Sequence, residues 1–357
     1  MSEFKASGFS DEFGSGGPDL VGVTTMTSPY YFVPPSGTTA ERPESPPPGM
    51  LRFNTDIGRL EVWRNDHWAT ILGESSAPIG GRAITVRLTT IDYVTIATTG
   101  NSIDFGDQTS INMDEVNCCA SSTRGILAGG YSVPAGNRED VIDFITIATL
   151  GDTTDFGNLT SGKSGVAALS DSTRGVFGGG FPATNAIDFI TIASTGNAQD
   201  FGDMLTLNSY GMLATSSPTR GMFAGKNPTN NTVEYITIQS TGNAVDFGDL
   251  ITARYYPMMN SSSTRALFAG NQSPTINTIE YVTIASTGNG TDYGDLTSAR
   301  GGAQGTSSPT RGLFPGGGNT VIIDFVTTAT LGDAQDFGDL TRSGTYFGST
   351  SNAHGGL

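Results

Sequence analysis

Internal repetition is the feature of this sequence that most limits how it can fold. The phrase Asp-Phe/Tyr-Gly recurs six times, at intervals of 44 to 51 residues. Its aromatic residues are Phe105, Phe156, Phe201, Phe247, Tyr293 and Phe337. A second phrase, Thr-Arg followed by apolar and glycine residues, recurs at Arg124, Arg174, Arg220, Arg265 and Arg311. Repeats of this length predict copies of one small structural unit that pack against one another.

Each unit contains four segments that are typical of β-strands. A third phrase, Ile-Asp/Glu-Phe/Tyr-Ile/Val-Thr, is rich in β-branched and aromatic residues. The Asp-Phe-Gly segment, a stretch of small apolar residues and the segment after Thr-Arg supply three more. Four strands in about 46 residues predict one propeller blade per unit. A parallel β-helix coil is usually shorter, and the absence of a 3.6-residue periodicity excludes a helical solenoid.

The two ends of the repeat array each carry part of a unit. Residues 79–81 precede the first unit as 177–179 precede a later one, and residues 351–357 align with 307–313. We therefore predict that strands from both ends share the last blade. The expected fold is all-β, with a six-bladed β-propeller over residues 77–357 closed by both termini, which leaves no exposed sheet edge.

The repeated unit resembles the kelch type of β-propeller. It shares a strand that ends in Gly-Gly, an aromatic residue in a later strand and a period near 46 residues. The Gly-Gly pairs are Gly129-Gly130, Gly179-Gly180 and Gly316-Gly317. The resemblance implies that Phe105 and its equivalents fill the place of the tryptophan that kelch units usually carry. It implies a fold and no particular activity.

The N-terminal part differs from the repeats. Eight of the 17 prolines lie within residues 1–48, which predicts an extended Pro-rich arm. The aromatic residues Tyr30, Tyr31 and Phe32 in this arm are candidate anchor residues that dock on a neighbouring surface.

Residues 49–76 read as a small three-stranded β-meander. Trp63 and Trp68 are expected to form its core rather than a sugar platform, and they join the candidate anchor. A meander of this size is marginal alone, so we expect it to oligomerise or to dock.

This meander resembles a module of bacteriophage tail-fibre and other appendage proteins. The residues that carry the likeness are Gly49, Arg52, Phe53, Asn54, Thr55, Gly58, Leu60, Glu61, Val62, Trp63 and Trp68. Together with residues 28–35, the stretch resembles virion structural proteins of cyanophages. The resemblance implies a virion protein present in several copies, bound to other virion proteins.

Charge and composition exclude several functions. The net charge of −16 disfavours nucleic acid and anionic membranes as partners, and no stretch is apolar enough to insert into a membrane. The chain has two His and two adjacent Cys, Cys118 and Cys119, which we expect to pack as small apolar residues. We predict no catalytic, cofactor-binding or metal-binding residue and no cofactor.

The repeated charges are expected to be structural. A ring of acids binding Ca²⁺ is the alternative, but catalytic and ligand sites are seldom copied six times. The acids of the third phrase are Asp92, Asp143, Asp188, Glu234, Glu280 and Asp324. We expect them to bind backbone amides and the repeated Arg, and we expect the Arg to form ion pairs or to stack on aromatic rings.

Residues that differ between units are better candidates for recognition. The candidates in such loops are Tyr131, Arg138, Phe181, Lys226, Arg254, Tyr255 and Tyr256. Drift in solvated loops explains the same variation equally well.

Three functions fit these observations. The favoured one is a non-enzymatic phage virion protein whose N-terminal arm anchors a displayed propeller, with a host-cell surface glycan or protein as candidate partner. The alternatives are a propeller-type carbohydrate-active enzyme and a cellular kelch-like adaptor that binds proteins.

Overall fold

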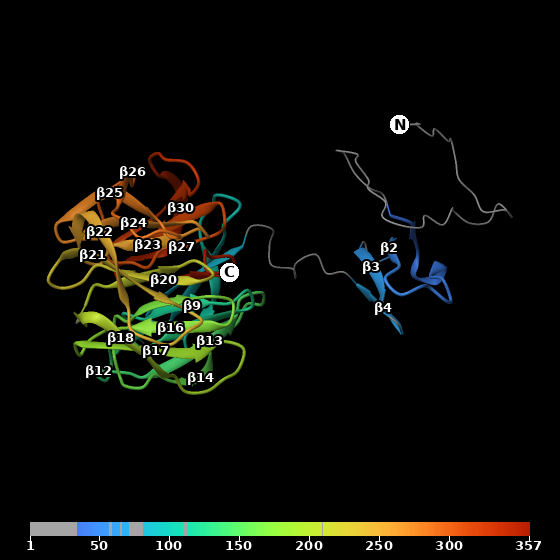
Figure 1. Ribbon diagram of the computed structural model, residues 1–357, viewed down its shortest axis with the longest axis horizontal. Coiled ribbons are helices and arrows are strands. Elements are labelled where there is room, and N and C mark those ends of the chain that lie inside the picture. Colours follow the sequence, from blue (N-terminus) through green and yellow to red (C-terminus); the bar gives the residue numbers. More distant parts are fainter. Residues whose placement is uncertain (1–33, 57–58, 65, 71–80, 110–112, 209) are drawn as a thin grey trace. The chain divides into compact units, whose positions relative to one another are not determined.

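The computed structural model divides the chain into two compact units, residues 1–75 and 76–357. The structure describes residues 34–56, 59–64, 66–70, 81–109, 113–208 and 210–357. These residues form β-strands and their connections, with one 3₁₀ turn, η1 (Thr39–Glu41) (Figure 1). The candidate anchor residues Tyr30, Tyr31 and Phe32 lie outside the described residues.

The first unit is a four-stranded sheet in the order β1-β2-β3-β4. Its strands are β1 (Ser36–Gly37), β2 (Leu51–Asn54), β3 (Arg59–Arg64) and β4 (His67–Thr70). The predicted three-stranded meander is present as β2, β3 and β4, and β1 adds a fourth strand from the part of the chain that was expected to be an extended arm. Ser36 and Gly37 pair in parallel with β2 and form a short edge strand. Two prolines precede them, and proline is tolerated at the edge of a sheet, where its missing N–H leaves no hydrogen bond unmade. Part of the predicted arm therefore belongs to the sheet.

One face of this sheet buries polar residues. Arg52, Asn54 and Glu61 are at most 3% exposed. The Glu61 carboxylate accepts hydrogen bonds from the Arg42 guanidinium and from Asn54 Nδ2, the latter at 3.1 Å. Arg52 Nη2 donates to the Thr38 carbonyl at 2.9 Å. This network ties residues 38–42 to the sheet.

The second unit contains six four-stranded antiparallel sheets, numbered here along the chain. Sheet 1 is β31 (Gly348–Ser351), β5 (Arg82–Arg87), β6 (Thr90–Thr95) and β7 (Ile103–Asp107). Sheet 2 is β9 (Asn117–Ala120), β10 (Arg124–Ala128), β13 (Val141–Thr146) and β14 (Thr154–Asn158). Sheet 3 is β15 (Ala167–Ser170), β16 (Arg174–Gly178), β17 (Thr184–Thr191) and β18 (Gln199–Asn208).

Sheets 4 to 6 repeat this order. Sheet 4 is β19 (Leu213–Ser216), β20 (Arg220–Ala224), β21 (Asn230–Thr237) and β22 (Val245–Arg254). Sheet 5 is β23 (Met258–Ser261), β24 (Arg265–Gln272), β25 (Thr275–Thr283) and β26 (Thr291–Asp295). Sheet 6 is β27 (Thr306–Ser307), β28 (Arg311–Pro315), β29 (Thr320–Thr327) and β30 (Gln335–Gly344). A small sheet of β8 (Met113–Asp114), β11 (Tyr131–Ser132) and β12 (Asn137–Arg138) is added beside sheet 2.

Sheet 1 combines strands from both ends of the repeat array, as the sequence predicted. β31 pairs with β5, with Ser351 opposite Ala83. The alignment of residues 79–81 with 177–179 is wrong, however. β5 begins at Arg82, which takes the place of the arginine in Thr-Arg. Arg82 was missed because Gly81, and not Thr, precedes it.

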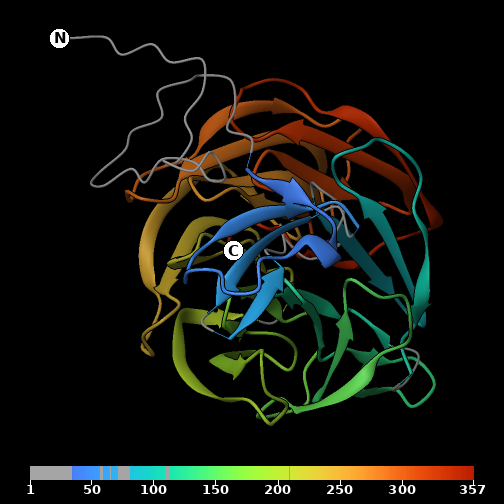
Figure 2. The same cartoon turned by 90° about the vertical axis from the view of Figure 1, so that its right-hand side faces the viewer.

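The first strands of the sheets lie next to one another in the order β9, β15, β19, β23, β27, β31 and again β9. The sheets follow one another around a common centre, with residue 357 near that centre (Figure 2). Backbone bonds join neighbouring sheets, as from the Gly151 N–H to the Phe105 carbonyl at 3.0 Å. The equivalent bond from Gly100 to Phe337, at 2.8 Å, joins sheet 1 to sheet 6.

The repeated aromatic and Arg residues hold the sheets together. Phe105 and its equivalents are 2–3% exposed. Each lies edge to face with an aromatic ring of the third phrase, at 5.7–6.1 Å between centroids. The repeated Arg, with Arg82 as a sixth, stack on that same ring at 4.5–4.9 Å. Their guanidinium groups donate to carbonyls of the next sheet, as from Arg174 to Ile238 at 3.0 Å. Stacking was therefore the correct expectation for these arginines, and ion pairing with the repeated acids was not.

The acids of the third phrase link each sheet to the preceding connection. Asp324 accepts hydrogen bonds from the Thr297 N–H at 3.0 Å and from Arg300 Nη1 at 2.8 Å. Glu280 pairs in the same way with Arg254 Nη2 at 2.6 Å. Arg254 is 0% exposed and also donates to the Gly270 carbonyl, so it is not available to a partner. Its prediction as a recognition residue is wrong because this buried ion pair holds it inside.

Candidate functional site

Six residues with left-handed backbone conformation surround one end of the second unit's centre. Each lies five positions before the last residue of the first strand of its sheet, here called the inner strand. Their φ angles lie between 51° and 85°. These residues, here called the axial mouth, are Glu115, Gly165, Gly211, Tyr256, Gly302 and Tyr346. Backbone hydrogen bonds connect several of them, from Gly165 to Glu115 at 3.0 Å and from Gly302 to Tyr256 at 2.9 Å.

Three positions of the axial mouth are not glycine. Glycine adopts positive φ at no steric cost, whereas Glu115, Tyr256 and Tyr346 are strained there. Strained residues persist where the surrounding structure enforces them, and they are concentrated at functional sites. The axial mouth is therefore the candidate functional site.

The side chains of Glu115, Tyr256 and Tyr346 meet at a small cavity of about 10 Å³. Gly165 makes their approach possible. A Cβ at this position would lie 3.1 Å from Tyr256 Oη and 4.0 Å from Glu115 Oε2. The cavity has room for about one water molecule.

Several polar atoms at this end are buried and have no hydrogen-bond partner among the described residues. Tyr256 Oη and Gln272 Oε1 are two of them. Tyr256 is 4% exposed. Gln272 Nε2 donates to Tyr346 Oη at 2.8 Å, which turns the amide oxygen away from that partner. The site therefore offers unused hydrogen-bonding capacity.

The titratable groups of the axial mouth are shifted by burial. Burial raises the pKa of the Glu115 carboxyl, and the neighbouring Asp114 charge adds to the rise. Burial, followed by the charge of Glu115, raises the pKa of the Tyr256 hydroxyl well above its usual value. Tyr256 therefore keeps its proton and remains a hydrogen-bond donor.

Aromatic side chains continue outward from the axial mouth. Tyr131, Phe181, Tyr210 and Tyr255, here called the aromatic rim, are all partly exposed. Phe181 and Tyr210 stack in parallel, with centroids 4.7 Å apart and planes at 8°. The Arg138 guanidinium lies 4.2 Å from the Phe181 centroid and donates to Tyr210 Oη at 3.2 Å.

The aromatic rim joins the axial mouth through Tyr255. Its ring lies 4.9 Å from that of Tyr256, and the Tyr256 ring lies 5.1 Å from that of Tyr346. Aromatic groups from five different connections thus form one surface with two acids, Asp114 and Glu115, beside it.

Five of the seven predicted recognition residues come together here. They are Tyr131, Arg138, Phe181, Tyr255 and Tyr256. Lys226 instead donates to the Thr206 hydroxyl. The sequence prediction missed Glu115, Tyr210, Gln272 and Tyr346. The signal that could have found Glu115 and Tyr346 is their position in the repeat, where other units have glycine.

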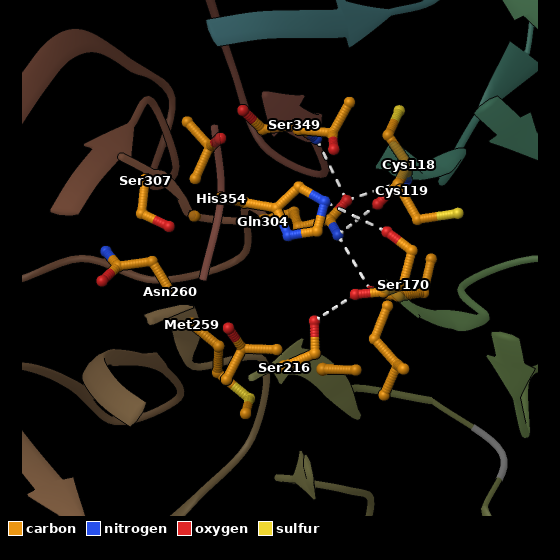
Figure 3. A pocket seen from close by; sticks show the side chains of 17 residues that line it. Cys118, Cys119, Ser170, Ser216, Met259, Asn260, Gln304, Ser307, Ser349 and His354 are labelled. Atoms are coloured by element: carbon orange, nitrogen blue, oxygen red, sulfur yellow. Dashed lines mark hydrogen bonds between the residues drawn. The ribbon is translucent and has the colours of Figure 1, made fainter. Parts of the chain in front are cut away.

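The opposite end of the centre holds a second cavity, of about 30 Å³ (Figure 3). Serine hydroxyls at the ends of the inner strands line it and bind the preceding sheet. Ser216 Oγ donates to the Ser170 carbonyl at 2.6 Å, and Ser261 Oγ to the Ser216 carbonyl at 2.7 Å. This serine belt is a further contact between sheets.

His354 and Ser170 lie 3.2 Å apart in this cavity, but they do not form a catalytic pair. His354 Nε2 lies 2.8 Å from the Ala120 carbonyl and must carry the proton there, while Nδ1 accepts from the Gly356 N–H at 3.1 Å. Neither nitrogen is free to take a proton from Ser170. Burial also lowers the pKa of His354, which keeps the ring neutral.

The two cysteines beside this cavity are buried and unpaired with each other. Burial raises the pKa of Cys119 to about 12 and that of Cys118 well above its usual value. Neither forms a thiolate near neutral pH, so they pack as apolar residues, as the sequence predicted.

The described part of the chain contains no group of three or more His, Cys, Asp or Glu residues placed to hold a metal ion. No helix of these residues is long and apolar enough to cross a membrane. The sequence matches no protein-family model and no curated protein.

Proposed function

We propose that this chain is a non-enzymatic structural protein of a phage virion. In this proposal, residues 76–357 are a closed, six-bladed, kelch-like β-propeller displayed on the tail or capsid, and the N-terminal unit attaches it. Six four-stranded sheets for six repeats support the propeller. Hydrogen bonds that return from sheet 6 to sheet 1 support its closure.

The sheet of the first unit supports a role in attachment. One face of the sheet carries the buried Arg52, Asn54 and Glu61 together with the rings of Trp63 and Trp68, whose centroids lie 5.6 Å apart. Leu51, Phe53 and Val62 alternate with these residues and remain partly exposed. Phe53 lies opposite Leu60, and Leu51 opposite Val62, so these apolar residues share the other face. A small sheet with a partly exposed apolar face is suited to packing against another protein.

One observation supports recognition by the second unit. Five residues chosen from the sequence because they vary between repeats meet at a single end, beside the axial mouth. Variable residues that had drifted in solvated loops would have no reason to gather. We propose that this end faces a host-cell surface and binds a component of it.

The proposal is tested by following the full-length protein into virus particles. Mass spectrometry of purified particles should detect it in several copies. Val62→Glu should prevent its incorporation while the second unit stays folded, because the charge disrupts the attachment face. Thr55→Glu, at an exposed turn of the same sheet, is the matched control and should be incorporated normally. Particles that lack the wild-type protein would overturn the proposal.

A further inference from the structure

The unused hydrogen-bonding groups of the axial mouth point to a ligand. A buried polar atom without a partner destabilises the folded state, so Tyr256 Oη and Gln272 Oε1 at one end of the unit call for an explanation. Tyr256 Oη faces the cavity, 3.1 Å from the Cβ position of Gly165, and Gln272 lies behind Gly302, with its Cδ 3.6 Å from the Cβ position of that glycine. A single water molecule in the cavity can serve Tyr256 Oη when no ligand is bound.

The surroundings of this cavity decide between classes of ligand. An anionic ligand would be repelled by the carboxylates of Glu115 and Asp114. A quaternary ammonium ion needs an open aromatic cage, but the rings of Tyr255, Tyr256 and Tyr346 lie in contact, at 4.9 and 5.1 Å. An apolar ligand would leave the polar atoms unsatisfied. Flat, partly exposed rings beside hydrogen-bond donors and acceptors fit a neutral sugar, which has apolar C–H faces and hydroxyl edges.

We infer that the axial mouth and the aromatic rim bind a neutral saccharide. One hydroxyl group of the sugar enters the mouth and replaces the water. It accepts a hydrogen bond from Tyr256 Oη and donates one to the Glu115 carboxylate, since both groups lie beside Gly165. The C–H face of the sugar ring packs on the aromatic rim. The inference rests on the proposed function only for the source of the saccharide, a host-cell surface glycan.

The sugar ring stays outside the axial mouth and does not enter the centre of the second unit. The cavity of about 10 Å³ admits no more than one hydroxyl group. Gln304 closes the channel below it, because its Oε1 accepts from the backbone N–H groups of Cys118 and Ser349 at 2.8 and 3.0 Å. Its Nε2 donates to the Cys118 carbonyl at 2.7 Å. The site therefore recognises the exposed end of a glycan.

The test uses the full-length protein and the methyl glycosides of glucose, galactose, mannose and N-acetylglucosamine. Saturation-transfer NMR and calorimetry should detect binding of at least one of them, with a Kd on the order of 1 mM. Tyr256→Phe should weaken that binding about tenfold and leave the melting temperature equal or higher, because it removes a buried unpaired hydroxyl. Phe181→Ala should also weaken it, through loss of the stacked rim.

Tyr281→Phe is the matched control, since Tyr281 stacks on Tyr293 and Arg265 away from the axial mouth, and it should bind as the wild type does. Failure of all four glycosides to bind at about 100 mM would overturn the inference. Unchanged binding by Tyr256→Phe would also overturn it. Neither result bears on the proposed attachment role of the N-terminal unit, because incorporation into particles is measured separately.

Discussion

Asn101 Oδ1 accepts a hydrogen bond of 3.0 Å from the backbone N–H of Asp339, a residue 238 positions later in the chain. The same bond joins consecutive sheets, as from the Asp203 N–H to Asn243 Oδ1 and from the Asp249 N–H to Asn289 Oδ1, both at 3.0 Å. The contact between sheet 6 and sheet 1 is thus equivalent to the contacts between sheets adjacent in sequence.

Removal of β31 should destabilise the whole second unit. Deletion of residues 348–357 exposes the edge of β5 and removes the contacts of β31 with β9 and β27. We expect aggregation or a fall in melting temperature on the order of 10 °C. Deletion of residues 353–357 alone keeps β31 and should cause a much smaller change. An unaltered melting temperature after the longer deletion would contradict the role of β31 in joining the two ends.

The glycine of Asp-Phe-Gly should not tolerate a side chain. A Cβ at Gly202 would lie 2.5 Å from the Gly242 carbonyl oxygen in the next sheet. Gly202→Ala should therefore lower the free energy of unfolding by more than about 1 kcal/mol relative to Gly242→Ala. Gly242 is the matched control, since it has a similar φ, 153° against 146°, and no atom near its Cβ position. Urea denaturation measures both, and equal losses would show that the close approach is relaxed in solution.

Much of the fold could be predicted because each repeated phrase makes a repeated contact. The Asp-Phe-Gly glycine approaches the backbone of the next sheet, and the stacked Arg donates hydrogen bonds to it, while the two aromatic rings pack against each other within one sheet. The spacing of the phrases therefore reports the architecture directly. Arg82 escaped detection because it shares with the other units its stacking on a ring and its hydrogen bond to the next sheet, but not its flanking residues.

The candidate site was only partly predictable. The six positions of the axial mouth share a backbone conformation rather than a residue type, and Gly, Glu and Tyr all occur there. Conversely, Arg254 is held inside by a buried ion pair with Glu280, as Lys163 is with Asp188 and Arg300 with Asp324. Variation between repeats therefore identifies positions under different constraints without telling which of them reach the surface.

The stacked arginines should be energetically coupled to their rings. Arg174 lies 4.9 Å from the Phe189 centroid and donates to the Ile238 carbonyl of the next sheet. A double-mutant cycle of Arg174→Met and Phe189→Leu should give a coupling free energy of about 0.5–1 kcal/mol by urea denaturation. Additive losses would mean that the hydrogen bond alone fixes the guanidinium.

Removal of divalent cations should leave stability unchanged. The buried carboxylate of Asp188 is already occupied, since it lies 2.8 Å from Lys163 Nζ and accepts from Thr160 Oγ1 at 2.7 Å. We expect the same melting temperature with and without EDTA. A loss of several degrees would identify the repeated acids as cation ligands.

Glu115 should make stability depend on pH in a defined direction. Burial raises the pKa of the Glu115 carboxyl in the folded state above its usual value of 4.5. The charged groups that face this carboxyl are Asp114 and Arg138, and the Tyr256 hydroxyl beside it is neutral. Because the folded state binds this proton more tightly, its contribution to stability falls as the pH rises from 4.5 through the folded pKa.

Replacement of Glu115 by Gln removes this penalty. The variant should therefore melt at a higher temperature than the wild type at pH 7. The difference should shrink as the pH is lowered through the folded-state pKa towards 4.5, and it should be lost below that pH, where the wild-type carboxyl becomes protonated in both states. Thermal melts of the two proteins at matched pH values measure this difference, in which the titration of the other carboxylates cancels. A difference that stays constant between pH 7 and pH 4.5 would show that burial does not control the proton of Glu115.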